Sequence, residues 1–170
     1  MSKPGSSILR EIVASPSSRD RIIKENFEAR NVPSWMFEWR PIRVEGVIGG
    51  KSYVLEYLAT PDYLSLGDDG DFFRGPLTPR LAQAFADAVD AVLPSRRMVN
   101  EIYANANGKL IPQPVSHNKA SLEDWARHEI MIQQQQKALG LPSGTFLAGH
   151  KKDIVVGPNL DGSRVAIYGW

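Results

Sequence analysis

Strand-like and helix-like periodicities occupy separate stretches of this 170-residue chain. Strand-forming residues are concentrated at 42–58, whereas the apolar residues of 78–139 recur at the spacing of helices, and strand-like runs return from residue 145. Alternating β and α segments would build a parallel sheet, but segregated segments favour an α+β arrangement. We therefore predict an α+β fold in which an antiparallel sheet packs against about three to four helices.

The antiparallel part is expected to begin with a hairpin. Gly49 and Gly50 form a two-residue turn between the strand-like runs 42–48 and 53–58. Aromatic residues also alternate through 35–39, which predicts that this stretch is extended as well. Turn residues on both sides of a short strand at 63–66 indicate a meander. The C-terminal strands are predicted at 145–148, 153–156 and 164–168.

Capping residues mark the predicted helices. Thr78 is followed by Pro79 at a first helical position, and Ser121 with Asp124 resembles a capping box. A run of glutamines at 133–136 is interpreted as a solvated face of the last helix. The predicted helices cover about 19–30, 79–93, 96–107 and 122–139.

Length and composition predict a single domain over residues 1–170. Within it we expect a flexible N-terminus at 1–17 and a proline-marked linker at 111–120. No stretch approaches the roughly 18 to 20 apolar residues of a membrane span. The N-terminal residues also lack the apolar run of a secretion signal, so a soluble, cytoplasmic protein is expected.

Charge and residue types disfavour several kinds of function. The net charge is +1 and no dense basic stripe occurs, which disfavours a nucleic-acid partner. The chain has no cysteine, which excludes disulfides and thiolate chemistry. Its histidines, His117, His128 and His150, lack the spacing of metal ligands, so we expect neither a metal nor a cofactor.

The best candidate for chemistry is the charged segment between the C-terminal strands. We predict that His150 is a general base or acid, that Asp153 orients it, and that Lys151 or Lys152 stabilises an anion. The alternative is a solvated β-turn whose charges only maintain solubility. The substrate-binding residues predicted to assist are Arg74, Asp71, Tyr63 and Trp39.

Four parts of the sequence resemble a pattern found in bacterial and phage-encoded hypothetical proteins that have no settled activity. These parts are 61–67, 76–83, 93–103, and 148–153 with 165–170. In that group the chain continues beyond the equivalent of Trp170 into a segment with histidine and tyrosine. The resemblance thus implies that this chain is short at its C-terminus and lacks part of a site.

Three hypotheses of function follow. The first is a hydrolase-like domain that acts on a polar biopolymer, with bacterial cell-wall material suggested by the resemblance. The second is a non-catalytic interaction or assembly module, virion- or phage-associated, that binds a partner chain or a second copy through its C-terminal strand and a Trp-rich surface. The third is a truncated, inactive relic of the longer proteins.

Overall fold

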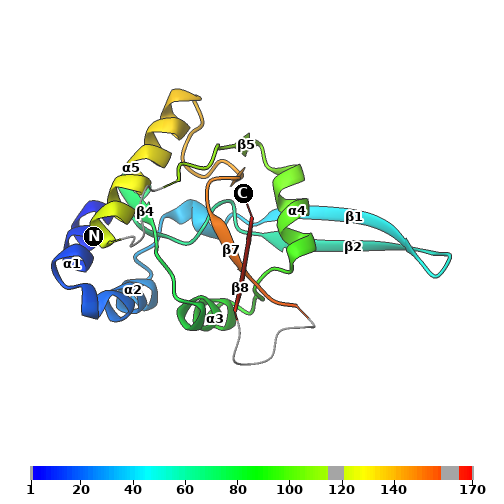
Figure 1. Cartoon of the computed structure of the whole chain (residues 1–170), viewed down its shortest axis with the longest axis horizontal. Coiled ribbons are helices and arrows are strands. Elements are labelled where there is room, and N and C mark those ends of the chain that lie inside the picture. Colours follow the sequence, from blue (N-terminus) through cyan, green and yellow to red (C-terminus); the bar gives the residue numbers. More distant parts are fainter. Residues whose placement is uncertain (1, 115–120, 158–164, 170) are drawn as a thin grey trace.

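The computed structural model describes residues 2–114, 121–157 and 165–169, and these residues form an α+β fold (Figure 1). The helices are α1 (Gly5–Ala14), α2 (Arg19–Glu28), α3 (Pro79–Ala88), α4 (Arg96–Asn105) and α5 (Leu122–Ala138), with 3-10 turns η1 (Pro16–Ser18) and η2 (Ser34–Phe37). The strands are β1 (Arg40–Ile48), β2 (Lys51–Ala59), β3 (Ser65–Gly67), β4 (Phe72–Arg74), β5 (Gly108–Lys109), β6 (Leu147–Ala148), β7 (Lys152–Val155) and β8 (Ala166–Gly169). The predicted fold class is confirmed.

The strands pair in separate two-stranded ladders rather than in one continuous sheet. Three ladders are antiparallel, namely β1 with β2, β3 with β4 and β7 with β8, whereas β5 and β6 run parallel. Outside the β1–β2 hairpin each strand has only two to four residues. Such short ladders are not stable by themselves, so helices and loops must complete the core around them.

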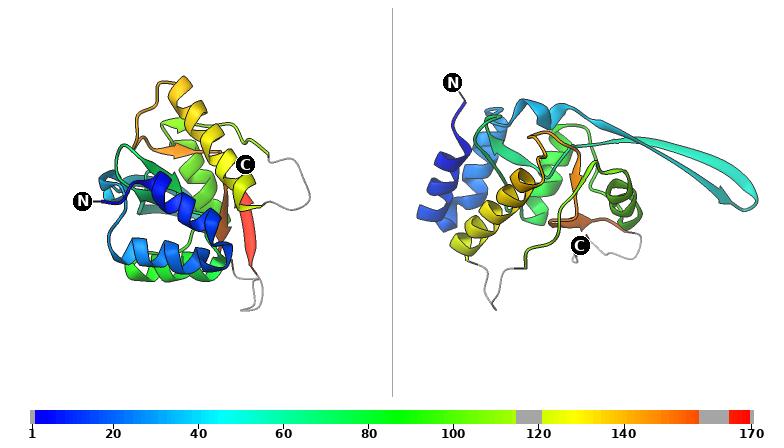
Figure 2. Two further views of the ribbon diagram at one scale, coloured as in Figure 1. Left: turned by 90° about the vertical axis from the view of Figure 1, so that its left-hand side faces the viewer. Right: turned by 90° about the horizontal axis from the view of Figure 1, so that it is seen from above.

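The β1–β2 hairpin confirms the turn predicted at Gly49 and Gly50. Both glycines have positive φ angles, of 58° and 78°, as a tight two-residue hairpin turn requires. The register runs without a break from the Ile48–Lys51 pair to the Arg40–Ala59 pair. The hairpin extends well beyond the rest of the protein as a twisted ribbon (Figures 1 and 2).

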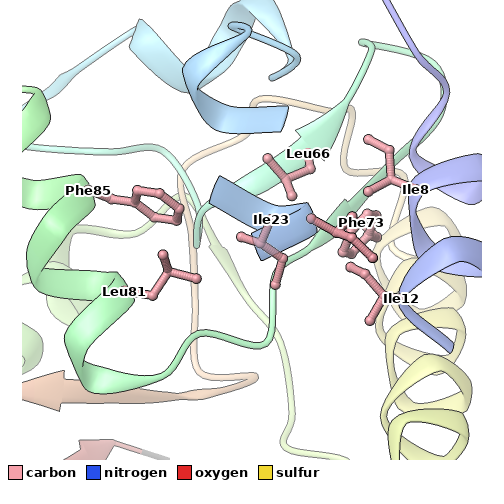
Figure 3. Close-up of a cluster of buried hydrophobic side chains, with 8 residues drawn as sticks. Ile8, Ile12, Ile23, Leu66, Phe73, Leu81 and Phe85 are labelled. Atoms are coloured by element: carbon pink, nitrogen blue, oxygen red, sulfur yellow. The ribbon is translucent and has the colours of Figure 1, made fainter. Parts of the chain in front are cut away.

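The N-terminal region is part of the core, so the prediction of a flexible segment at 1–17 is wrong. Ile8 and Ile12 lie four residues apart on one face of α1, and both are fully buried. They pack in a cluster with Ile23, Leu66 and Phe73, as Figure 3 shows. The spacing of the two isoleucines is that of an amphipathic helix, whose apolar face is stable only when another surface covers it.

The stretch 35–39 is not extended, which corrects the second local prediction. Pro33 starts a 3-10 turn in which the Met36 amide donates to the Pro33 carbonyl and the Glu38 amide donates to the Trp35 carbonyl. Trp35 is buried and packs edge-on against Phe72, with ring centroids 5.0 Å apart. The alternating aromatics therefore do not form a Trp-rich surface, because burial of Trp35 decides the local conformation.

The predicted helix starts are confirmed at three positions. Thr78 and Ser95 accept hydrogen bonds from backbone amides three residues on, and Ser121 does the same within a capping box with Asp124. No helix in the described ranges is both long and apolar enough to cross a membrane. Part of the predicted linker (115–120, with His117), the turn at 159–162 and Trp170 lie outside the described residues.

Burial of α1 leads to a first prediction. Ile12→Ala should lower the free energy of unfolding by about 2–5 kcal/mol, because it leaves a cavity in a fully packed cluster. The matched control is Ile130→Ala, which removes the same atoms from an exposed position on α5 and should cost less than about 0.5 kcal/mol. Urea denaturation measures both values. Equal small effects would mean that α1 does not pack as described.

Candidate functional site

The guanidinium group of Arg74, at the end of β4, is fully buried and contacts three polar side chains. Nη2 donates to Asp62 Oδ2 at 2.7 Å and to Gln136 Oε1 at 2.8 Å, and Nη1 donates to Glu129 Oε1 at 2.8 Å. Glu129 and Gln136 are seven residues apart, two turns of α5, so both project from the same face of that helix. Arg74 thus joins three separate segments of the chain.

Two further charged or polar side chains come from the segment after β6. His150 Nε2 lies 3.2 Å from Asp62 Oδ1, and Lys151 Nζ lies 3.2 Å from Glu129 Oε2. Both distances are short enough for ion pairs, but the atoms are not aligned for hydrogen bonds. Both ring nitrogens of His150 are therefore buried without a hydrogen-bond partner among the described residues. We call this set, Asp62, Arg74, Glu129, Gln136, His150 and Lys151, the buried charged cluster.

Gly149 permits the close approach that positions His150. Its φ angle is 98°, and a Cβ atom there would lie only 2.5 Å from the Leu110 carbonyl oxygen. Any other residue would therefore clash with the backbone beside β5 and be strained in φ. Only glycine lets the chain turn from β6 into the buried charged cluster.

Opposite charges control ionisation within this cluster. Burial alone would raise the pKa of Asp62, but Arg74 and His150 outweigh it and lower the pKa to about 2. Burial would also lower the pKa of Arg74, yet Asp62 and Glu129 raise it above its ordinary value. Asp62 and Arg74 consequently form an ion pair at neutral pH.

A small cavity lies next to the cluster. Its volume is about 80 Å³, and its wall includes the carboxyl groups of Asp62 and Asp153 and the phenol of Tyr63. The remaining lining residues are Ala59, Thr60, Val99, Ile102, Tyr103, Leu147, Ala148 and Gly149. Space of this size holds a few water molecules but not a sugar or peptide unit.

Tyr63 connects the cavity to the C-terminal segment. Its hydroxyl lies 2.7 Å from the Lys151 carbonyl and 3.1 Å from Asp153 Oδ2, and it can donate its one proton to either acceptor. Its ring meets the His150 ring edge-on, with centroids 5.0 Å apart. Burial, followed by the charge of Asp153, raises the pKa of Tyr63, so the phenol stays protonated and can act only as a hydrogen-bonding group.

Unlike Asp62, Asp153 forms no ion pair with a cation in the part of the chain that the structure describes. Burial raises the pKa of Asp153 to about 6, although the Tyr63 hydroxyl partly opposes this rise. A carboxyl group with this pKa exchanges its proton near neutral pH, as general acids and bases must. Two carboxyl groups on one cavity are thus kept in different protonation states by their surroundings.

The structure brings together five of the residues predicted from sequence, namely Tyr63, Arg74, His150, Lys151 and Asp153. The pairing within this set differs from the prediction, because His150 faces Asp62 rather than Asp153. His150 is also not a residue of the cavity wall. The charged segment is therefore not the solvated turn that we considered as the alternative.

Three predicted residues lie elsewhere. Lys152 is exposed on β7, and Trp39 is half-buried ahead of β1 without lining the cavity. Asp71 accepts hydrogen bonds from the amide and hydroxyl of Ser6, at the start of α1. Asp71 is thus occupied in holding a helix end, which the acidic, glycine-rich sequence around it does not reveal.

Sequence reasoning missed three members of the cluster. Asp62 follows Pro61 in a stretch that the sequence indicates is a turn, and Glu129 lies between His128 and Ile130 on α5. Gln136 belongs to the glutamine run that was predicted to be solvated, but it is buried against Arg74. The signal in the sequence was the helical spacing of Glu129, Ile132 and Gln136, which places all three on one face of α5. Because Ile132 is buried, that face points into the core.

Comparison of the chain with protein-family models, with curated proteins and with solved structures finds no match in any of the three. Among the residues that the structure describes, no group of three histidine or carboxylate side chains is arranged to hold a metal ion. The function of the site therefore has to be judged from its own geometry and charges.

The buried charged cluster predicts a large effect of removing its cation. Arg74→Met should lower the free energy of unfolding by about 3–5 kcal/mol, because Asp62 and Glu129 would remain buried without compensation. The control is Arg97→Met, which breaks the pair with Glu101 at a side chain that is 67% exposed and should cost less than about 1 kcal/mol. Chemical denaturation measures the unfolding free energy of both variants. Equal losses of stability would contradict the burial of Arg74 between the two carboxylates.

Asp153 predicts a specific dependence of stability on pH. Its pKa is raised from 3.8 to about 6, so between these values the folded protein keeps a proton that the unfolded chain loses. The contribution of Asp153 to stability should accordingly be complete below pH 3.8 and decline as the pH rises toward about 6. Asp153→Asn cannot ionise. The unfolding free energy of the wild type minus that of this variant should fall over this range, and a constant difference would contradict the shift.

Proposed function

We propose that the protein is a hydrolase-like domain that acts on a polar biopolymer, with Asp153 as the proton-transferring group. The observation that carries the proposal is that two carboxyl groups line one small cavity that can hold a few water molecules. The pKa of Asp153 is near 6, whereas Asp62 stays ionised. Perturbed carboxyl groups at a cavity are typical of acid–base catalysis. His150 has a supporting role here, which revises the role predicted from sequence.

The size of the cavity decides what it holds. At about 80 Å³ it is well below the roughly 300–1,000 Å³ of pockets that enclose a small-molecule ligand. It suits an attacking water, while the bond to be cleaved would lie at the cavity mouth. This arrangement fits an extended polymer that binds along the surface better than it fits a small metabolite.

The proposed step uses the ionised form of Asp153. The carboxylate takes a proton from the cavity water as the water oxygen bonds to the electrophilic atom of the substrate. The bond from that atom to the leaving group then breaks, and the same proton passes to the leaving group. Tyr63 holds the carboxylate in place through its hydroxyl. The Asp62 carboxylate accepts a hydrogen bond from the backbone amide of Tyr63 at 2.7 Å. Because Arg74 and His150 hold Asp62 in turn, this wall of the cavity is rigid.

Bacterial cell-wall material is the first substrate to test, since the sequence resembles bacterial and phage-encoded proteins. With purified peptidoglycan, hydrolysis should rise as the pH passes through about 6, because Asp153 must be ionised. Asp153→Asn should reduce the rate at least about 100-fold. The control, Asp87→Asn, changes an exposed aspartate on α3 and should leave the rate unchanged.

Tyr63→Phe separates a positioning role from a merely structural one. The hydrogen bond from Tyr63 lowers the pKa of Asp153, so its loss should move the midpoint of the pH–rate profile above 6. A lower rate with an unmoved midpoint would argue against Asp153 as the titrating group. Full activity of Asp153→Asn would refute the proposed function.

A non-catalytic assembly module, such as a virion component, is the second candidate. The observation in its favour is at the C-terminal strand, where β8 pairs only with β7 among the described residues and exposes Ile167. An edge strand with an exposed apolar side chain can add a strand from a partner chain. Lack of hydrolysis together with loss of assembly in Ile167→Lys would favour this candidate.

A further inference from the structure

The β1–β2 hairpin, residues 40–59, has one face that is mostly apolar and a second face on which charged residues alternate with Val47, Val54 and Leu58, and we call this hairpin the arm. One face carries Ile42, Val44, Leu55 and Tyr57, and at its base α4 covers this face, where the Tyr57 hydroxyl donates to Glu101. Farther out, nothing among the described residues covers the same face. Its exposed apolar residues are Ile48, Tyr53 and Leu55, each more than half exposed. The apolar face is therefore continuous with the core but only partly covered.

The outer edge of β1 is also unpaired, since β1 pairs only with β2 in the part of the chain that the structure describes. A two-residue turn closes on a hydrogen-bonded pair, here Ile48 with Lys51. Alternation from that pair makes the backbone N–H and C=O groups of Val47, Glu45 and Arg43 point away from β2. Pro41 is next in this series and offers only a carbonyl.

We propose that two copies of this chain pair through the outer edges of β1, antiparallel around a two-fold axis at Val44. In this register Arg43 of each copy lies directly opposite Glu45 of the other copy. The pattern is self-complementary, as a two-fold interface requires, because each contact occurs twice. The ladder would contain about six hydrogen bonds, with Val47 of each copy donating to the Pro41 carbonyl of the other.

Charge selects this register over its neighbours. An axis at Arg43 or at Glu45 would place two like charges directly opposite each other, which destabilises antiparallel pairs. Only the axis at Val44 pairs opposite charges at both symmetric positions. The exposed location of the existing Arg43–Glu56 and Arg43–Glu45 ion pairs leaves the Arg43 side chain within reach of a second copy.

The edge of β2 does not offer the same complementarity. Its outward-pointing residues are Ser52, Val54, Glu56 and Leu58, which include an acid but no base. Symmetric pairing of this edge could gain no cross-strand ion pair. Pairing through β1 would instead create a four-stranded sheet whose apolar faces are continuous, and a sheet of this size is stable where an isolated hairpin is marginal.

A single cysteine tests the geometry, and the chain contains no other. In the proposed dimer the two copies of position 44 form a non-hydrogen-bonded pair with Cα atoms about 4.5 Å apart, close enough for a disulfide. Val44→Cys should therefore form covalent dimers under mild oxidation. Leu55→Cys, on the same face but one strand away, would place its two copies about 14 Å apart and should not crosslink.

Charge reversal provides a test that does not rely on crosslinking. All variants carry Glu56→Gln, which removes the ion pair between residues 43 and 56 within the arm. A change at residue 43 therefore does not create or break that pair. In this background Glu45→Arg should raise the dimer Kd at least about tenfold, and adding Arg43→Glu should restore it, because opposite charges again face each other. Sedimentation equilibrium gives the Kd of each variant.

Several results would overturn the proposal. These are a wild-type chain that stays monomeric at every concentration, equal crosslinking of the two cysteine variants, and a dimer whose Kd is the same in both charge variants. Pairing of β1 with a different protein, without self-association, would overturn it as well. None of these results bears on hydrolysis, so the dimer and the proposed function can fail separately.

Discussion

The ion pair between Arg74 and Asp62 is the contact on which the rest of the site depends. A buried guanidinium group must have carboxylates around it, and Arg74 finds them on the segment after β2 and on α5. The same carboxylates then face His150 and Lys151, which come from the C-terminal part of the chain. Four segments that are distant in sequence are thereby held in one arrangement, although replacing such a cluster by apolar residues need not reduce stability.

This arrangement separates the two carboxyl groups of the cavity by their surroundings. Asp62 has Arg74 beside it, which keeps its pKa near 2, whereas Asp153 is buried beside the Tyr63 hydroxyl and has a pKa near 6. The local sequences around the two aspartates do not predict this difference in pKa. It arises because Asp62, but not Asp153, is paired with a cation among the described residues.

Local features of the fold were predictable because their causes are local. Thr78, Ser95 and Ser121 cap the helices that follow them, and the paired glycines after Ile48 close the predicted hairpin. The errors at α1 and at residues 35–39 have another cause. Both segments bury apolar side chains against parts of the chain more than thirty residues away, and the local pattern does not identify these partners, although the spacing of Ile8 and Ile12 is that of an amphipathic helix.

The sequence by itself determined the α+β class, the hairpin register and the presence of titratable residues at 150–153, since turn chemistry and side-chain periodicity act between neighbours. Tertiary structure alone decided that His150 faces Asp62 and that Asp153 faces Tyr63. It also decided that Gln136 is buried rather than solvated. The reason is that burial and charge pairing are properties of contacts between distant segments, and these contacts set both the pKa values and the shape of the cavity.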